Sequence, residues 1–446
     1  MFVESVNSFL WGSILPLLLL GTGIYLTIRS GFFQIRKFGL MFRMTLGRVF
    51  QSVGAENKSG LSAWETVSTA LASTLGTGSI IGIALAIKAG GPGAVFWMWI
   101  SAFFGMITKY SEIVLSVHYR TKNEKGFFVG GPMYYLQNGL GSKLLSLSFA
   151  VLCLCTCFGI GNTIQANAVS AVICNQIGLN PKLIGFVLSA LVGLVVLGGV
   201  KRVAAINARL VPFMSIVYIS CCIIILILRI NFIPKIIASI FKEAFTIPAL
   251  GGGFSSYGFF LAMKHGFSKG IFSNEAGLGS APIAHSSSSS EDPTEQGMWG
   301  MFEVFFTTII ICTLTALVVL CCDVHSFQHM DGSEIALFAF RSVLLRAGGF
   351  CICLSIILFS ISTILGWAFY GEICLSFLLK NRKQFLWLFR FSFVIASYYG
   401  CIGEMEQIWS YSELINALMA IPNLIGVLFL SEQVMRISKK CFEKNV

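Results

Sequence analysis

Charged residues are scarce in this chain. Aspartate, glutamate, lysine and arginine together make up 11% of its 446 residues, whereas 56% of the residues are hydrophobic. Soluble domains contain about 25% charged residues, because their surfaces face water. The deficit excludes a soluble globular protein and indicates an all-α polytopic membrane protein.

Acidic residues and histidines are few, with 20 aspartates and glutamates and 5 histidines. A membrane-embedded enzyme needs a nucleophile, an acid or base, or a metal close together, but the titratable residues of the apolar runs fall on separate runs. The 14 cysteines lie mostly in apolar runs, where cysteine acts as a small hydrophobic residue. We therefore expect neither an enzyme nor a cofactor.

Long apolar runs take up most of the sequence. Roughly 20 apolar residues cross a bilayer as a helix, and no loop is long enough for a separate soluble domain. We expect a single transmembrane domain over residues 1–446. Its eleven predicted spans are residues 9–29, 65–89, 93–118, 145–175, 182–200, 208–229, 256–282, 298–321, 350–379, 386–403 and 414–431.

The net charge of +11 does not indicate nucleic-acid binding, because the basic residues are spread over alternate loops. These loops lie on one side of an eleven-span protein, and the acidic residues of the loops after the eighth and tenth spans lie on the other. The positive-inside rule places the N-terminus outside and the C-terminus in the cytoplasm. We expect a multi-pass protein of the bacterial inner (plasma) membrane.

The first apolar run, residues 9–29, could instead be a signal peptide. No basic segment precedes it, since Glu4 is the only charged residue before it, and no small-residue cleavage pattern follows it. We expect a retained span.

The apolar run at residues 66–89 is interrupted at its centre. Gly76-Thr77-Gly78-Ser79 places two glycines and two hydroxyls where a membrane helix should be continuous. In hydrocarbon every backbone N–H and C=O needs an internal partner, so a broken helix occurs where it is buried in protein or lines a polar cavity. The break is a candidate binding site.

A second interrupted run, residues 255–284, has glycines and polar residues around Ser273, Asn274 and Glu275. Each broken run is followed by four apolar helices, and the two broken runs start on opposite sides of the membrane. This pattern is typical of transporters built from two inverted repeats with a site at the midplane. We expect a 5+5 inverted repeat, with one repeat at 65–229, the other at 256–431, and 9–29 as an extra N-terminal span.

Polar side chains also occur in other predicted spans. Gln165 lies one turn from Gly161, so it either faces substrate or forms an interhelical hydrogen bond. Ser362 and Thr363 are adjacent hydroxyls, with Trp367 one turn further along the helix; hydroxyls in helices often bond back to their own carbonyls.

Two further patterns have a structural interpretation. Lys109 and Glu112 are spaced i,i+3 and can form an ion pair on one helix face. His285 and the serine run 286–290 fall in a cytoplasmic loop, where low-complexity serine is typical of a flexible linker or gate.

Several long blocks resemble the signature of the alanine or glycine:cation symporter family, also described as sodium:alanine symporters. They extend through most of residues 60–430. The blocks are GTGSI at 76–80, GGPGAVFWMW at 90–99, GGPMYY at 130–135, FSNEAGLGSAPIA at 272–284 and STILGW at 362–367. The resemblance implies a LeuT-like fold and cation-coupled symport of alanine, glycine or both, with sodium or a proton as the coupling ion.

The resemblance and the polarity of broken helices together suggest roles for individual residues. The N-terminus of a half-helix attracts a substrate carboxylate, whereas carbonyls and hydroxyls at the second break receive an ammonium. The expected substrate-binding residues are Thr77, Gly78, Ser79, Gln165, Phe272, Ser273, Asn274, Thr363 and Trp367. The expected sodium-binding residues are Ala72, Leu75, Phe359, Ser362 and Thr363.

Three alternatives stay open within this prediction. Thr363 could contact the ion or the substrate. The carrier could be proton-coupled or sodium-independent, and it could take another small amino acid such as D-alanine or serine.

A channel is disfavoured, because two inverted broken helices in one chain indicate alternating access. We expect the protein to be a monomer.

Overall fold

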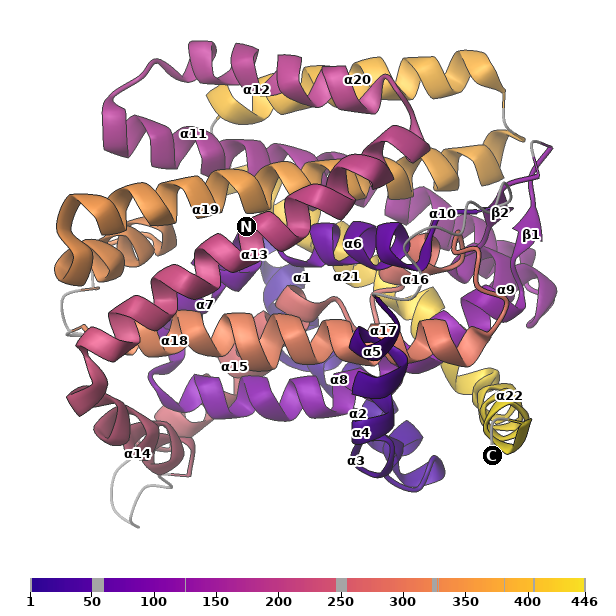
Figure 1. Ribbon diagram of the computed structural model, residues 1–446, viewed down its shortest axis with the longest axis horizontal. Coiled ribbons are helices and arrows are strands. Elements are labelled where there is room, and N and C mark those ends of the chain that lie inside the picture. The colour runs from indigo at the N-terminus through magenta and orange to yellow at the C-terminus, as the bar shows by residue number, and fades with distance from the viewer. Residues whose placement is uncertain are drawn as a thin grey trace.

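The computed structural model describes residues 2–49, 60–124, 126–245, 255–322, 327, 329–380, 382–403 and 406–444. These residues are helical almost throughout, which confirms the predicted all-α class (Figure 1). Two short antiparallel strands, β1 (Thr121–Lys122) and β2 (Phe128–Val129), form a hairpin in the loop after α8.

The helices follow one another with few long connections; short 3₁₀ or π segments are labelled η. Those of the first half are α1 (Phe2–Phe9), η1 (Leu10–Ile14), α2 (Leu15–Arg29), α3 (Phe33–Arg36), α4 (Phe38–Met44), α5 (Leu46–Val49), α6 (Ala63–Thr74), η2 (Thr77–Ser79), α7 (Ile81–Gly90), α8 (Gly93–His118), α9 (Pro132–Asn138), α10 (Lys143–Phe158), η3 (Gly159–Thr163), α11 (Ile164–Ile177), α12 (Pro181–Val196) and α13 (Val200–Leu228). Those of the second half are η4 (Ile230–Phe232), α14 (Ile233–Ala244), α15 (Ser255–Asn274), α16 (Ala281–His285), α17 (Pro293–Val304), η5 (Phe305–Cys312), α18 (Thr313–Leu320), α19 (Gly332–Leu379), α20 (Lys383–Ile402), α21 (Glu406–Phe429) and α22 (Ser431–Lys444).

Helices occur at every position where a span was predicted. By length and hydropathy, 7 helices of the described residues can cross a membrane, and the bent pair of α6 with η2 and α7 makes an eighth. The helices α2 and α12 are apolar but shorter, and α15 is not among the seven. The multi-pass architecture is therefore confirmed, while the count of eleven spans stays a prediction.

The helices pack in two groups. In the first group, α8 packs against both α15 and α17, α15 packs against α7, and α16 packs against α6. In the second group, α12 packs against α20, and α19 packs against α10 and α11. Figure 1 shows α12 and α20 side by side at the top, with α8, α15 and α17 in the lower part. Because α6 and α13 both contact α19, the two groups meet at the first broken helix.

The first predicted break is confirmed. Ser62 and Glu65 form a capping box that starts α6. The helix ends at Thr74, and the ψ of 60° at the next residue, Leu75, lies outside the helical range. The chain then passes through η2, and the helix axes on either side of the break differ by 61°. A β-carbon at Gly76 would lie 2.8 Å from the hydroxyl oxygen of Thr363, so only glycine fits between these helices.

The second predicted break is also confirmed. α15 ends at Asn274, and α16 begins at Ala281. Between them, Glu275, Gly277 and Gly279 all have positive φ angles, of 53°, 90° and 82°. Left-handed backbone of this kind ends a helix and is readily adopted by glycine. The side chain of Glu275 accepts a hydrogen bond from Ser280 within the loop.

The serine run does not form a flexible loop, so that prediction is wrong. Ser286, Ser287 and Ser288 are completely buried. The N–H of Leu61 donates to the carbonyl of Ser287 at 2.8 Å, and the N–H of Ser289 donates to the carbonyl of Leu61 at the same distance. The segment before α6 is thus held to the loop after α16 as a strand-like bridge.

Candidate functional site

The predicted cation ligands of α6 and α19 lie together. The hydroxyl of Thr363 donates to the carbonyl of Ala72 at 3.0 Å, and the hydroxyl of Ser362 lies 3.3 Å from the same oxygen. Ser362 also donates to the carbonyl of Phe359 at 2.8 Å. Leu75, at the end of α6, is fully buried. Neutral oxygens are the ligands that hard cations prefer, so this cluster can contribute to a cation site.

Gln165 reaches the first break from α11. Its amide oxygen accepts a hydrogen bond from the backbone N–H of Thr77 at 3.3 Å, and its amide nitrogen donates to the carbonyl of Ile160 at 3.2 Å. The backbone N–H of Ser79, which was also predicted to meet the substrate carboxylate, donates to the carbonyl of Gly76 at 3.1 Å. At the Thr77 N–H, by contrast, the acceptor is the side-chain oxygen of Gln165.

The two breaks contact each other through hydroxyls. The hydroxyl of Ser79 lies 3.1 Å from that of Ser273, and the latter lies 2.9 Å from the thiol sulfur of Cys312. Thr315, on α18, donates to the carbonyl of Ser79 at 2.9 Å and lies 2.6 Å from the hydroxyl of Tyr218. A row of polar side chains therefore runs from the two breaks through Thr315 of α18 to Tyr218 of α13.

Phe272 and Asn274 take different positions at the second break. The ring of Phe272 lies 3.0 Å from where a β-carbon on Gly78 would be, so the ring covers the first break directly. Asn274 instead turns toward η5, where its amide nitrogen donates to the hydroxyl of Thr308 at 3.2 Å. Phe272 is thus beside the predicted substrate amides, and Asn274 holds the break to a neighbouring helix.

Trp367 lies against the π segment η3. A β-carbon on Gly161 would be 2.4 Å from its ring, and its ring centroid is 5.5 Å from that of Tyr370. The side chain is fully buried, and its indole N–H has no hydrogen-bond partner in the described part of the chain. A buried donor of this kind is uncommon.

The site is closed to solvent. Apart from Phe272, which is half-buried, the predicted site residues are buried, with no polar one more than 3% exposed. On the side where α8 ends, the guanidinium of Arg120 donates to the carbonyls of Ser288 at 2.6 Å and Ser290 at 2.9 Å. On the other side, Lys88 of α7 donates to the carbonyl of Met330 at 2.7 Å. These contacts hold the loops on the two sides of the site to neighbouring helices.

The predicted ion pair between Lys109 and Glu112 does not form, so that prediction is wrong. The ammonium of Lys109 lies 3.6 Å from the carboxylate of Glu303 and donates to the carbonyl of Asn274 at 3.0 Å. Glu112 points elsewhere and accepts a hydrogen bond from Asn423. The physical reason is that the C-terminal carbonyls of α15 and a carboxylate on α17 attract the ammonium more than one carboxylate on its own helix.

The ion pair extends to a histidine. His285 Nε2 lies 3.0 Å from the second carboxylate oxygen of Glu303, and its Nδ1 lies 3.0 Å from the amide oxygen of Gln296. Lys109, Glu303 and His285 are all completely buried. A buried charge needs such partners, and this cluster connects α8, α16 and α17 to the end of α15.

Sequence reasoning missed several of these residues. Thr308, Cys312 and Thr315 recur at a spacing of i, i+4 and i+7, which identifies one helix face. Glu303 is a carboxylate within a predicted span, and such residues indicate a function or a buried partner. Both signals were present in the sequence.

An interrupted helix in each half of the chain, with a buried polar centre between them, is typical of secondary transporters built from inverted repeats. Solved structures with a similar fold are known. A sodium-coupled sialic acid symporter in a substrate-bound outward-open state is similar at a TM-score of 0.58 and 12% identity, covering 95% of this chain and 86% of that one. MhsT in complex with L-phenylalanine also matches at a TM-score of 0.58, with 13% identity over 84% of this chain and 90% of that one. These likenesses confirm the predicted fold.

The chain belongs to the sodium:alanine symporter family, whose model matches residues 1–445. It is 39% identical to the sodium/alanine symporter AgcS of Methanococcus maripaludis, over 98% of this chain and 96% of the relative. It is 35% identical to the probable sodium/glutamine symporter GlnT of Bacillus subtilis, over 97% of this chain and 88% of the relative. The family resemblance is confirmed, and the protein is a membrane transporter rather than an enzyme.

Proposed function

We propose that this protein couples the inward movement of sodium to the uptake of alanine, glycine or both by alternating access. The observation that carries the proposal is the group of neutral oxygens at the first break. The hydroxyls of Ser362 and Thr363, on α19, lie 3.3 Å and 3.0 Å from the carbonyl oxygen of Ala72, on α6, where the two packing groups meet. A cation held there would join the two packing groups and favour the conformation in which the site is closed to solvent.

The ion site is proposed to consist of the carbonyls of Ala72, Leu75 and Phe359 with the hydroxyls of Ser362 and Thr363. Thr363 is assigned to the ion rather than the substrate, because its hydroxyl already contacts the Ala72 carbonyl. The relative AgcS, named as a sodium/alanine symporter, supports sodium as the ion. No cofactor other than this coupling ion is proposed.

The substrate carboxylate is proposed to bind the amides of Thr77, Gly78 and Ser79 and to displace the Gln165 oxygen from the Thr77 N–H. Gln165 then turns to the substrate ammonium. Half-helix N-termini attract anions because their dipole is positive, and the carboxylate would also replace the bond from the Ser79 N–H to the Gly76 carbonyl. The contact of 3.3 Å between Gln165 and Thr77 supports this exchange, since an acceptor already sits at that amide.

The other half of the substrate is proposed to face Phe272, Ser273 and Trp367. Asn274, which the sequence predicted as a substrate ligand, is proposed to hold the second break to η5 instead, because its amide nitrogen donates to the hydroxyl of Thr308. Ser273 supplies a hydroxyl within 3.1 Å of Ser79. The indole N–H of Trp367, which has no partner among the described residues, is proposed to donate to the substrate, and its ring is proposed to limit the substrate side chain to about a methyl group. Because a relative is named for glutamine transport, size selection by this residue is the feature that needs testing.

The proposed orientation follows the distribution of lysine and arginine over the loops. It places the N-terminus outside and the C-terminus, with α22, in the cytoplasm of a bacterial cell. The two repeats are proposed at residues 65–229 and 256–431, and the transporter is proposed to act as a monomer. One charge moved through 100 mV is worth about 2.3 kcal/mol, or roughly 50-fold accumulation of a neutral substrate.

Binding measurements test this function. Labelled alanine is bound to the purified protein at increasing sodium chloride, with choline chloride keeping ionic strength constant, and unlabelled glycine, D-alanine, serine and glutamine compete. We expect sodium to tighten alanine binding and glycine to compete well. Equal binding in sodium and choline would contradict sodium coupling, and stronger competition by D-alanine, serine or glutamine would replace the substrate assignment.

A further inference from the structure

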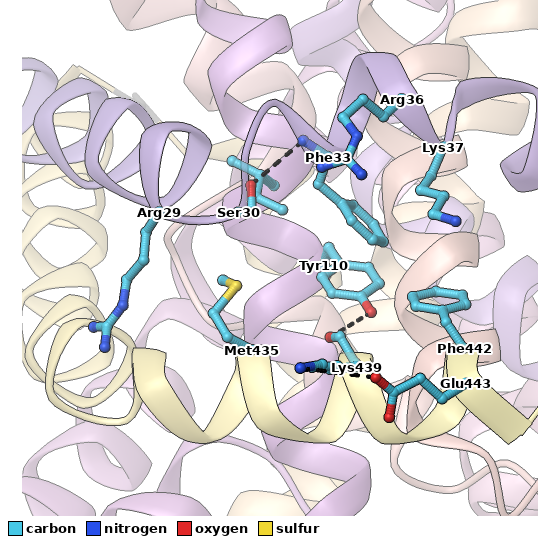
Figure 2. A pocket seen from close by; sticks show the side chains of 12 residues that line it. Arg29, Ser30, Phe33, Arg36, Lys37, Tyr110, Met435, Lys439, Phe442 and Glu443 are labelled. Carbon is cyan, nitrogen blue, oxygen red and sulfur yellow. Dashed lines mark hydrogen bonds and ion pairs between the residues drawn. The ribbon is translucent and has the colours of Figure 1, made fainter.

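A basic cavity lies outside the transport site, between the end of α2, the short helix α3 and the C-terminal helix α22. Its volume is about 680 Å³ (Figure 2). Four basic side chains and one acidic side chain line it. They are Arg29, Arg36, Lys37, Lys439 and Glu443.

Aromatic contacts fix the shape of this cavity. The ring centroid of Phe33 lies 4.8 Å from that of Tyr110, which belongs to α8, and 5.7 Å from that of Phe442, which belongs to α22. The hydroxyl of Tyr110 lies 2.7 Å from the hydroxyl of Ser438. Figure 2 shows Phe33 and Tyr110 between Arg36 and the helix α22, with Arg29 to one side of them. Three separate elements therefore build one pocket with an apolar floor.

Among the residues that the structure describes, two of the basic side chains have no acidic partner. Arg29 lies 4.0 Å from Glu432, and Lys439 lies 3.8 Å from Glu443. By contrast, neither Arg36 nor Lys37 forms an ion pair within the residues that the structure describes. Arg36 contacts the carbonyl of Gly31 at 3.5 Å, and the ammonium of Lys37 lies 5.2 Å from the ring centroid of Phe442. Uncompensated positive charge at a built pocket favours an anionic ligand.

The position of the pocket indicates where this anion comes from. The apolar helix α2 ends at Arg29, and α22 follows the last predicted span. The pocket therefore lies at a membrane surface, which is the cytoplasmic one in the proposed orientation. On α22, Arg436, Lys439 and Lys440 are exposed, whereas Val434 is buried. A phospholipid has the matching chemistry, since its phosphodiester is anionic and its glycerol and acyl chains are apolar.

We propose that this cavity binds the phosphodiester headgroup of an anionic phospholipid, with Arg36 and Lys37 as the main contacts and the ring of Phe33 beneath the glycerol. Basic pockets between helices on the cytoplasmic side commonly hold such headgroups. A free phosphate ion would satisfy the charges but leave the aromatic floor uncovered. The lipid joins α2 and α3 to the C-terminal helix, so α22 is held against α8 when the pocket is filled.

Lipid binding is measured on the purified full chain in a zwitterionic detergent, without sodium or amino acid, so that the result is independent of the transport function. The probes are short-chain phosphatidylglycerol, short-chain phosphatidylcholine and inorganic phosphate. The test variant is Arg36→Gln with Lys37→Gln. The matched control is Arg43→Gln with Lys440→Gln, which removes the same charge from exposed residues that do not line the cavity.

We expect phosphatidylglycerol to bind much more tightly than phosphatidylcholine or phosphate. Each basic residue near an anionic lipid surface contributes about fivefold, so the test variant should bind phosphatidylglycerol about 30-fold more weakly. The control should stay within about twofold, and both variants should elute as the wild type does in size-exclusion chromatography. Equal weakening in both variants would overturn the proposal, and equally tight binding of inorganic phosphate would overturn the assignment to a lipid.

Discussion

The hydroxyl of Thr363 donates to the backbone carbonyl of Ala72 at 3.0 Å. This bond connects α19 of the second packing group to the last turn of α6, just before the first break. Both residues are buried, with Thr363 at 2% exposure. A sodium ion at this place would replace one weak contact between the groups by several ion–oxygen contacts, which explains how ion binding could favour substrate binding a few residues away.

Replacing the hydroxyls of the proposed ion site should weaken sodium activation. We expect Ser362→Ala and Thr363→Ala each to raise the sodium concentration for half-maximal alanine uptake by about tenfold, because each removes one oxygen from the ion. The maximal rate at saturating sodium should fall less. Ser376→Ala is the control, since Ser376 lies on the same helix and donates to the carbonyl of Glu372 within it. An unchanged sodium requirement in both test variants would refute the site.

Glycine 76 should not tolerate a methyl group. In Gly76→Ala the new β-carbon would lie 2.8 Å from the Thr363 hydroxyl and 3.3 Å from the Gln165 amide oxygen. Overpacking of this kind costs about 1–3 kcal/mol, and here it displaces two proposed ligands, so uptake should fall at least about tenfold. In Gly82→Ala, on α7 of the same broken span, the added carbon meets nothing within 4 Å. Wild-type uptake by Gly76→Ala would show that the close approach is not required.

The amide of Gln165 should be needed for substrate recognition. We expect Gln165→Ala to abolish alanine uptake, because it removes the amide that is proposed to turn from the Thr77 N–H to the substrate ammonium. Asn167→Ala is the comparison, since this neighbouring amide on α11 faces away from the break and donates to the carbonyl of Gly400. Uptake is measured as initial rate against alanine concentration. Unchanged apparent affinity and rate in Gln165→Ala would remove this residue from the site.

The buried pair of Lys109 and Glu303 should matter for stability. Lys109→Met leaves a buried carboxylate without its cation, which typically costs about 3–5 kcal/mol. Adding Glu303→Gln should recover part of that loss. The exposed pair Arg436 and Glu432 provides the contrast, because a surface pair contributes about 0–1 kcal/mol. Thermal unfolding of the detergent-solubilised variants measures the difference, and equal melting temperatures for Lys109→Met and Arg436→Gln would contradict the account.

The sequence was sufficient to predict both broken helices, because glycines and hydroxyls at mid-membrane are physically costly unless they serve a site. It also predicted that Ala72 would meet Ser362 and Thr363, through the family resemblance. It could not predict which cation pairs with which anion. The ammonium of Lys109 pairs with Glu303, almost two hundred residues away in the sequence. Residue spacing along one helix carries no information about such contacts.

The serine run was predicted to be flexible, and the structure shows that it is held in place. Five consecutive serines at 286–290 have the composition of a linker, yet the first three are buried. Their backbone is held by the backbone of Leu61 and by the guanidinium of Arg120. Composition describes side chains, whereas this loop is held through its carbonyls and N–H groups. The closure at this side of the site was therefore visible only in the structure.

Uptake into proteoliposomes tests the central claim most directly. Vesicles containing the purified chain receive labelled alanine under an inward sodium gradient, an inward proton gradient, or neither. The account predicts accumulation above the external concentration only with the sodium gradient, and collapse of that accumulation when sodium is equalised by an ionophore. Accumulation driven by protons alone, or equal uptake in all three conditions, would contradict sodium-coupled symport.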